Sequence, residues 1–570
     1  MLHWQPRVEP TKKELFILKR LKRTRKLFAF LRLRRHELFD EAFQVELASM
    51  YRDTGAGEEP VPPALLCMAL IVQGYLGVSD AEAVELSVLD LRWQMVLDNM
   101  SSETPAFGQG TLQQFRKRLI AHDMDRRLLE RTIELAKATR EFDWKKLPKE
   151  LRIAVDSRPL EGAGRVEDTI NLLGHAARKL ARCAAAILCR DFDDICSEAG
   201  VPLLRGSSLE AALDINWNDP EQKDAALEVL VEQVTHLNEW LESERLAMEE
   251  PLRPYIEAVA QVQKQDLKCN DEGRVRIRQG VAEDRRVSIE DAEMRHGRKS
   301  KTKRFNGYKE HIAADVDTNL IRACAVTAAN RPEEEAAPDL LDDLHRQQVT
   351  IGELLIDRAY VNSDLVDETR SQGGAILCKP WSGRNTNPDL FGKRHFKLNM
   401  RDNTITCPAG QVEHFEPGST VHFDPEVCGP CPLRAQCTKS ASGRGRTIHI
   451  GEDEKLQQRL RKIAASPKGR TQLRARTTIE HRLAHIAARK GPKARYHGQR
   501  CNVFDLRRAA TIQNLETIQR VQLKAASSRF NLFGALETRF ARVFGLGGHL
   551  LGVPPRDVTQ AFCNDCASSM

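Results

Sequence analysis

Residues 352–361 read GELLIDRAYV. Leu354, Leu355 and Ile356 form a short apolar run, which predicts a buried strand. The run ends in a carboxylate, Asp357, and two interpretations of that acid follow. It caps the next helix, a position that Asp favours, or it holds a cation or a proton at the end of a sheet strand.

The same pattern occurs earlier in the chain. Residues 150–157 read ELRIAVDS, an apolar strand that also ends in an acid, Asp156. Two strands that each deliver a carboxylate to their carboxyl end favour the second interpretation if they are neighbours in one sheet.

The order of the other predicted elements indicates the fold class. Between the two acidic strands we expect a helical insert, and after the second strand a turn-rich, β-rich insert followed by a helix. This order predicts a mixed α/β sheet with two large insertions. The ranges are a helical insert at about 166–265, strands at 307–316 and 320–329 joined by a turn at 317–319, helices at 332–348 and 362–372, a strand at 375–380, a β-rich insert at about 380–450, and helical sequence at 451–490.

Length and composition suit several folded domains. With 570 residues, we expect two to four domains. Residues 1–145 read as a helical domain, 146–520 as the α/β domain, and 521–570 as a tail whose role the pattern does not define.

Two features predict an intracellular, cytoplasmic protein. The chain has no run of about 18 apolar residues that could cross a membrane, and its N-terminus has no apolar segment of a secretory signal. We therefore expect no membrane partner. The 14 cysteines are expected to be thiols or metal ligands rather than a disulfide framework.

Positive charge is concentrated in two places. Between Thr11 and His36 there are eleven Lys or Arg residues and one acid, and residues 295–304 read RHGRKSKTKR. One such run is commonly a solvated helix face, whereas two favour a phosphate-backbone partner. The side chains that we expect to bind DNA are Arg20, Arg23, Arg298, Lys299, Lys301, Lys303 and Arg304.

A third acid lies in the predicted helix RTTIEHRLAHIAARK at 476–490. Glu480 borders the apolar stripe of this helix, and Arg476 lies four residues earlier on the same face. A carboxylate and a guanidinium so placed suit Mg²⁺ and phosphate respectively. The alternative is a surface ion pair worth about 0.3–0.5 kcal/mol, and spacing alone favours that alternative.

Four segments together resemble a known family. AVDSRPLEG, FNGYKEHIAADVDTNLIRACAVTAAN, LLIDRAYVNSD and RTTIEHRLAHIAARKGPKARYHG occur in the order found in the DDE transposases of bacterial insertion sequences. The chain most resembles the IS1182-like group of the IS4-type assemblage, over roughly residues 45–520. The resemblance implies an RNase H-like fold behind a helical N-terminal DNA-binding or accessory domain. It also implies that Asp156, Asp357 and Glu480 bind two Mg²⁺ or Mn²⁺ ions.

The implied activity is cleavage at the ends of the element and strand transfer into target DNA. The implied partners are double-stranded DNA, at the element ends and the target, and a second copy of the chain in a homodimer or larger synaptic complex. Two alternatives remain: an RNase H-like nuclease without strand transfer, and a descendant that only binds DNA. The intact acidic triad argues against the last.

The IS4-type signature is matched in part. Arg476 and Glu480 fit it, but Leu473 and Ala487 stand where the signature has Tyr and Lys. We expect Lys490, or else Lys493 or Arg495, to bind phosphate in place of the missing lysine.

A cysteine cluster lies in the β-rich insert. A CxxC pair with two further cysteines in a turn-rich region suits tetrahedral Zn²⁺, and similar transposases often carry such a pattern here. Thiolates are poor ligands for Mg²⁺, so the site would be structural and separate from catalysis. The alternative is four free thiols. The cysteines are Cys407, Cys428, Cys431 and Cys437.

Overall fold

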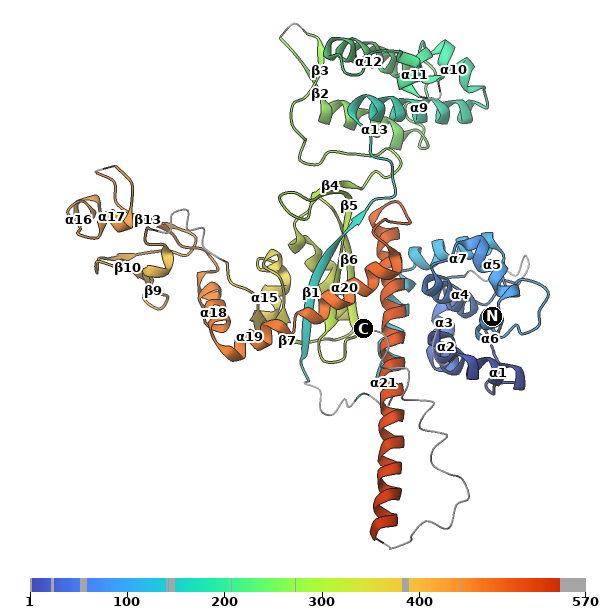
Figure 1. Cartoon of the computed structure of the whole chain (residues 1–570). Coiled ribbons are helices and arrows are strands. Elements are labelled where there is room, and N and C mark those ends of the chain that lie inside the picture. The colour runs from blue at the N-terminus through green and yellow to red at the C-terminus, as the bar shows by residue number, and fades with distance from the viewer. Residues whose placement is uncertain are drawn as a thin grey trace.

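The computed structural model describes residues 3–21, 25–51, 59–139, 142, 149–206, 208–271, 273–381, 389–441 and 443–543. Its N-terminal part is helical, as expected, and lies beside the central sheet (Figure 1). Helix α4 is apolar on nearly every face and is buried among the others. The helices are α1 (Lys12–Arg20), α2 (Lys26–Leu38), α3 (Glu41–Ala48), α4 (Pro63–Leu76), α5 (Asp80–Leu89), α6 (Leu91–Leu97), α7 (Gln109–Ala121) and α8 (Met124–Ala138).

The centre of the molecule is a six-stranded mixed sheet in which β5 pairs with β1, β4 and β6. Strands β6, β5 and β1 are antiparallel, and β1, β7 and β8 are parallel. This order confirms the predicted RNase H-like mixed sheet. The strands are β1 (Leu151–Glu161), β4 (Arg295–Arg298), β5 (Arg304–Asp315), β6 (Ile321–Ala328), β7 (Ile351–Leu355) and β8 (Ala375–Leu377).

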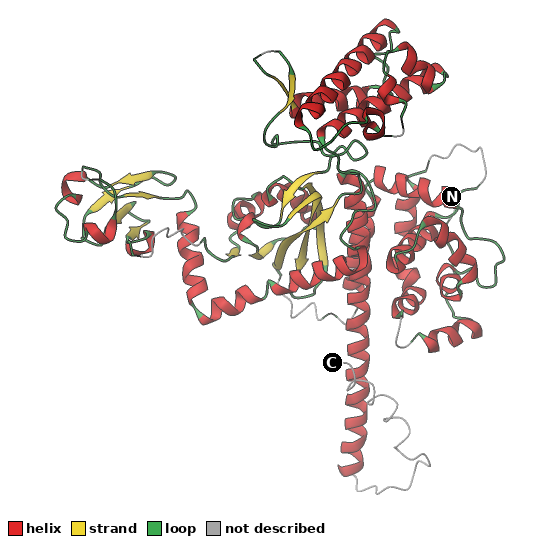
Figure 2. Cartoon of the chain, turned by 45° about the horizontal axis from the view of Figure 1, so that its top comes forward, coloured by secondary structure: helices red, strands yellow, loops and turns green. Residues whose placement is uncertain are grey.

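Helices cover both faces of this sheet (Figure 2). On one face Ile153 and Val155 of β1 pack in a cluster with α14 (Ala337–Arg346), α15 (Asp364–Ser371) and α18 (Glu454–Ala465). On the other, Ala154 packs in a cluster with α20 (Thr477–Lys490) and α21 (Gln499–Val543). Successive strand residues alternate between these faces. Three short elements, η2 (Glu333–Ala336), η3 (Arg358–Tyr360) and α19 (Pro467–Arg474), connect the helices and strands.

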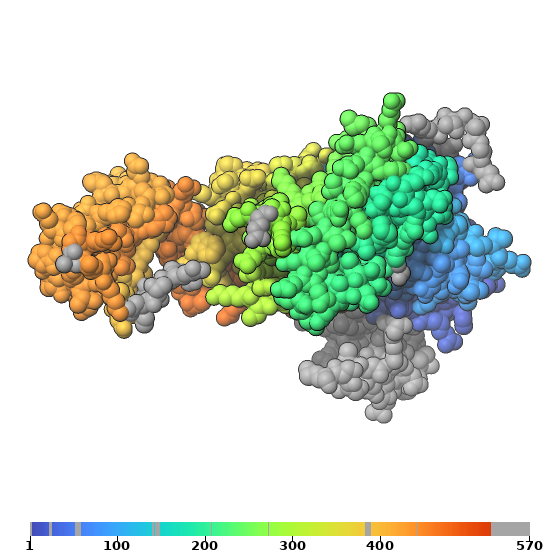
Figure 3. Space-filling view, turned by 90° about the horizontal axis from the view of Figure 1, so that it is seen from above, coloured from blue at the N-terminus to red at the C-terminus, as the bar shows by residue number. Residues whose placement is uncertain are grey.

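The two predicted insertions are present and project in different directions (Figures 1 and 3). The first has its own apolar core. Its elements are α9 (Thr169–Leu188), α10 (Phe192–Glu198), η1 (Pro202–Leu204), α11 (Leu209–Leu213), α12 (Pro220–Ser243), α13 (Arg253–Asp266), β2 (Leu267–Cys269) and β3 (Val275–Ile277).

The second insertion holds the cysteine cluster and is built on short strands, with two one-turn helices. Its elements are η4 (Lys393–His395), β9 (Lys397–Asn399), β10 (Thr404–Thr406), β11 (Val412–His414), β12 (Thr420–His422), α16 (Pro425–Cys428), α17 (Arg434–Cys437) and β13 (Thr447–His449).

Helix α21 goes beyond what the sequence pattern indicated. It begins at Gln499 and continues to Val543, across the predicted boundary at residue 520, and extends far past the sheet (Figure 1). Its first half packs against β6, α8 and α4. Among the described residues no single helix is long and apolar enough to cross a membrane, although α4 and α5, bent by 104°, reach that length and apolarity together.

Candidate active site

Strands β1 and β7 bring the first two acids together. The two strands pair in parallel with Ala154 opposite Leu355, and the same offset of 201 residues separates Asp156 from Asp357. Each acid lies two residues beyond this pair, so both side chains project from the same face as Ala154 and Leu355, the face that α20 covers. Asp357 follows the end of β7 as predicted, whereas β1 continues past Asp156 to Glu161, so the expected end of that strand at Asp156 is wrong. The two carboxylates are nevertheless neighbours beneath one helix.

Each of these acids accepts the backbone N–H of the next residue, and Asp357 thereby caps η3. Asp357 Oδ1 accepts the backbone N–H of Arg358 at 2.8 Å, and Asp156 Oδ1 accepts that of Ser157 at 2.9 Å. The capping interpretation of Asp357 is therefore confirmed, and it does not exclude the other, because one oxygen of each carboxylate remains for a second partner.

Arg476 connects Asp156 to the third acid. Its guanidinium lies 3.1 Å from Asp156 Oδ2 and 2.9 Å from Glu480 Oε1. The predicted i,i+4 pair is therefore present, and the same arginine also reaches the sheet. Since the Glu480 side chain is 51% exposed, its pair with Arg476 is worth at most about 1 kcal/mol. The contact to Asp156 joins the start of α20 to β1.

The pKa of Asp156 reflects this mixed environment. Burial raises the pKa, the Arg476 charge and the N–H of Ser157 lower it, and the charges of Glu333 and Asp357 raise it again; the net shift is upward. Burial is the largest cause of the raised pKa of Asp156, and the two neighbouring acids add to it, so that a cation bound at this place would lower that pKa.

Glu333 is a fourth carboxylate at this place, and sequence reasoning missed it. It is the first residue of η2, which follows β6 after a four-residue connection at 329–332, and it lines the same cleft as the three predicted acids. In the sequence it is the first of three glutamates after Pro332, a pattern that is typical of favourable charge at a helix N-terminus. What distinguishes Glu333 from Glu334 and Glu335 is its position in the fold, because of the three only Glu333 lines the cleft.

The cleft between the sheet and α20 has a volume of about 470 Å³. Besides the four acids it is lined by cations, among them the predicted Arg298 and Lys299 and also Arg158 and Lys309, which were not predicted. A cleft that is lined by both acids and cations suits a phosphodiester and the metal ions that accompany it.

The other predicted DNA-binding residues have different surroundings. Lys301, Lys303 and Arg304 are exposed at the turn between β4 and β5. Arg20 is exposed at the end of α1, with its guanidinium carbon 5.0 Å from the centre of the Phe16 ring. Arg23 lies outside the described residues.

Part of the N-terminal positive charge holds the fold together. Arg32 forms a buried ion pair with Glu14 at 2.7 Å. Arg35 is buried and donates to the carbonyls of Met95 and Val96 at 3.0 Å. These two arginines are therefore not available to DNA, and the basic run overstates the charge that the surface presents.

The placement of Lys490 does not support its predicted role. Its ammonium group is buried, 2.5 Å from Glu310 Oε1 and 2.9 Å from Asp505 Oδ2. It joins α20 to β5 and α21 and cannot reach a phosphate in the cleft without breaking two buried ion pairs.

A buried polar cluster supports the strand ends from the opposite face. His311 of β5 lies 2.6 Å from the hydroxyl of Tyr360 and 2.9 Å from that of Thr327. Burial lowers the pKa of His311 to about 3, so it is neutral. Tyr360 follows Asp357 by three residues, and the cluster thereby fixes the turn that carries this acid.

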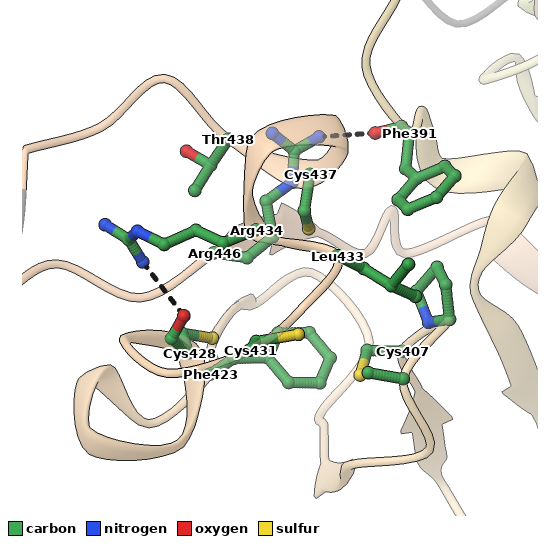
Figure 4. Close-up of a pocket in the computed structure, with 12 residues that line it drawn as sticks. Phe391, Cys407, Phe423, Cys428, Cys431, Leu433, Arg434, Cys437, Thr438 and Arg446 are labelled. Carbon is green, nitrogen blue, oxygen red and sulfur yellow. Dashed lines mark hydrogen bonds between the residues drawn. The ribbon is translucent and has the colours of Figure 1, made fainter.

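The four cysteines of the second insertion line one small pocket of about 30 Å³ (Figure 4). Cys407 follows β10, Cys428 ends α16, and Cys431 and Cys437 lie before and at the end of α17. Burial raises the pKa of Cys437, and the three other thiols raise it further. Space for about one water-sized particle lies among four sulfurs.

Neither cluster has closed geometry. Within the part of the chain that the structure describes, no three His, Cys, Asp or Glu side chains are arranged so that they could hold a metal ion. The donor types nevertheless fit: hard carboxylate oxygens at the cleft suit Mg²⁺, and four thiols suit Zn²⁺. Both metals remain predictions.

The fold and the cleft define a class: an RNase H-like sheet that collects carboxylates at its edge and surrounds them with cations. Comparison with known families then narrows the class. Residues 274–515 match the model of the transposase DDE domain, and residues 20–118 match that of a transposase domain, DUF772. Residues 274–515 are thus similar to a transposase DDE domain, and residues 20–118 to a transposase N-terminal domain.

The matched DDE region includes Asp357, Arg476 and Glu480, whereas Asp156 lies before it. The assignment of Asp156 therefore rests on its register with Asp357. No curated protein and no solved structure matches the chain.

Proposed function

We propose that the protein is a DNA transposase that cuts at the ends of an insertion sequence and transfers the freed strand into target DNA. The observation that carries this proposal is the placement of Asp156 beside Asp357, with Glu480 above them on α20 and the connecting Arg476 between. The matches to two transposase domains support it.

Asp156, Asp357 and Glu480 are the residues that would hold two Mg²⁺ or Mn²⁺ ions. Such ions, when bound, activate a water or a 3′-hydroxyl and stabilise the leaving oxygen of a phosphoryl transfer. The two aspartates orient toward the cleft because one oxygen of each is held by a backbone N–H group.

Arg476 has two roles in this scheme. Its guanidinium partly neutralises Asp156 and Glu480. Once these acids have another cation, the same guanidinium is free to donate two parallel hydrogen bonds to a phosphate. Arg298 and Lys299, which are exposed and line the cleft, would hold the phosphate backbone next to the scissile bond.

The test is cleavage of a labelled duplex that carries the element end, with Mg²⁺ or Mn²⁺. Asp357→Ala is expected to lower the rate about a thousandfold, because the site then loses several kcal/mol of transition-state stabilisation. Asp367→Ala, an exposed acid on α15, is the control and should cleave normally. DNA binding should survive in both variants.

The products separate the three activities. Joined DNA products indicate a transposase, and cleavage without joining indicates a nuclease. Tight binding of the end by the wild type, with no metal-dependent cleavage, indicates a protein that only binds DNA and contradicts the proposal.

We propose further that Cys407, Cys428, Cys431 and Cys437 bind one structural Zn²⁺. The convergence of all four side chains on one small pocket supports this. The zinc would stabilise the insertion and take no part in the chemistry at the cleft.

A further inference from the structure

A second hollow lies where the N-terminal helices meet the catalytic domain. It has a volume of about 670 Å³ and lies between α2 and α4 on one side and α20 and α21 on the other. We call it the junction groove and define it by Arg25, Lys26, Tyr75, Arg489, Gln513 and Arg520, which line it.

The junction groove is electropositive. Four of its lining residues are Arg or Lys, and the one acid, Glu516, already pairs with Arg489 at 2.8 Å. His485 also lines the groove. Burial lowers its pKa, the charges of Arg482, Arg520 and Arg489 lower it further, and the charge of Glu516 opposes them. A concave surface with excess positive charge attracts anions and concentrates them.

Gln513, which lines the groove, has a buried amide without a partner. Its side chain is 2% exposed, and in the described part of the chain neither its amide nitrogen nor its amide oxygen has a hydrogen-bond partner. Leaving a buried amide unpaired costs about 1–3 kcal/mol. A phosphate in the groove would accept from the amide nitrogen and offset part of that cost.

The Tyr75 ring contacts two of the arginines that line the groove. The guanidinium carbons of Arg25 and Arg489 lie 5.7 and 5.4 Å from the centre of its ring. These cation–π contacts restrict two long side chains before a ligand arrives. Less conformational entropy is then lost on binding than for freely moving arginines.

Helix α20 separates the groove from the catalytic cleft. Ala484 and Ala487 line the cleft, whereas His485, Ala488 and Arg489 line the groove. Since successive helical residues are about 100° apart, the two hollows lie on different sides of the helix. One short stretch of DNA in the cleft therefore does not fill the groove.

We propose that the junction groove binds the phosphate backbone of a DNA segment separate from the one that is cleaved. This inference rests on the proposed function and deepens it by naming a second DNA contact. It also gives the contact between the two domains a role, because neither domain forms the groove alone.

The test measures DNA affinity against salt concentration. Each phosphate contact contributes about 0.9 to the slope of log K against log salt. The variant Arg25→Gln/Lys26→Gln/Arg520→Gln should therefore lower the slope on a long duplex by about 2 to 3. The control Lys137→Gln/Lys264→Gln/Lys462→Gln removes three charges elsewhere and should change it much less.

A second variant tests the amide without altering charge. Gln513→Leu should weaken binding about tenfold at every salt concentration while the slope stays the same, because a hydrogen bond to a charged group is lost. Both groove variants should cleave a short duplex that fills only the cleft as fast as the wild type.

An equal slope for the groove triple variant and its control overturns the inference. The inference is also overturned if the groove triple variant binds duplex RNA more weakly than the wild type does but binds DNA equally well. The same holds if free inorganic phosphate, at unchanged ionic strength, abolishes the difference in DNA affinity between the variant and the wild type. If the wild type binds DNA through the groove and never cleaves it, the proposed function fails while the groove remains. If cleavage is intact and the slope is unaffected, the groove fails alone.

Discussion

The cleft contains more negative charge than the three predicted acids supply. Glu333 lies in it together with Asp156, Asp357 and Glu480, and its charge is one cause of the raised pKa of Asp156, after burial. One opposing cation lies close, because Arg476 contacts two of the acids. Four carboxylates at one edge favour divalent cations over a single guanidinium.

Glu333→Gln should therefore raise the Mg²⁺ concentration needed for half-maximal cleavage, by about tenfold, which corresponds to about 1.4 kcal/mol of lost attraction. Glu334→Gln is the matched control, because Glu334 is the next residue of η2 and does not line the cleft. The measurement is the rate of cleavage over a series of Mg²⁺ concentrations. The same Mg²⁺ dependence in both variants would show that Glu333 takes no part in binding the ions.

Single residues differ in how well their position is predicted. Asp156 and Asp357 were predictable because each carboxylate directly follows an apolar run, where a charged side chain stands out from its neighbours. Glu333 was not, because acids are ordinary in the first turn of any helix. Lys490 shows the opposite case: a lysine at a helix C-terminus suggests exposure, but here two acids from other elements bury it.

Among the elements, the cysteine insertion depends most on a stabilising ligand. Its apolar core is small, with Phe396, Phe415 and Phe423 as its largest buried side chains, and its strands have three residues each. Small units with so little core commonly need a metal or disulfides to fold. The four thiols around one pocket would supply that stability through zinc.

Cys431→Ser should remove bound zinc, from one ion per chain to none, and expose residues 389–450 to protease, because a site with three thiolates binds zinc much more weakly. Cys269→Ser changes an exposed cysteine elsewhere and should keep the zinc. Metal content by atomic absorption and limited proteolysis are the two measurements. The prediction is contradicted if the wild type contains no zinc and is cut by protease at the same rate as Cys431→Ser.

The predicted strands and helices of the sheet domain largely agree with the structure because their patterns are local. The predicted turn at 317–319 is present, and Asn319 in it has a left-handed φ of 62°, a conformation that Asn tolerates. Helix α21 was missed because half of it is buried on several sides, so that no single apolar stripe marks it.

At the scale of the whole molecule, the two domains share one core. Phe504, Ile512 and Leu515 of α21 belong to the same apolar cluster as the N-terminal helices, and the other side of α21 packs on the sheet. This shared core could not be predicted from the sequence. The domain boundaries were placed where the pattern of predicted helices and strands changes, and that pattern does not show which distant segments pack together.

Buried charges also join the domains through α21. Arg507 lies 2.8 Å from Asp123 and 3.2 Å from Asp125 of the N-terminal part, and 3.0 Å from Asp343 of α14. Burial alone would lower the pKa of Arg507, but these acids raise it overall. The arginine is therefore charged and holds three acids from both domains in one place.

Arg507→Leu should lower the free energy of unfolding by about 3–5 kcal/mol, because Asp125 and Asp343 are 2% and 1% exposed and each loses a partner. Arg500→Leu is the matched control. Arg500 contacts the same Asp125 at 2.5 Å but is 40% exposed, so its loss should cost about 1 kcal/mol or less. Urea denaturation measures both. An equal loss of unfolding free energy in the two variants would mean that the buried ion pairs of Arg507 do not hold the domains together. Other contacts would then have to keep the two sides of the junction groove in place.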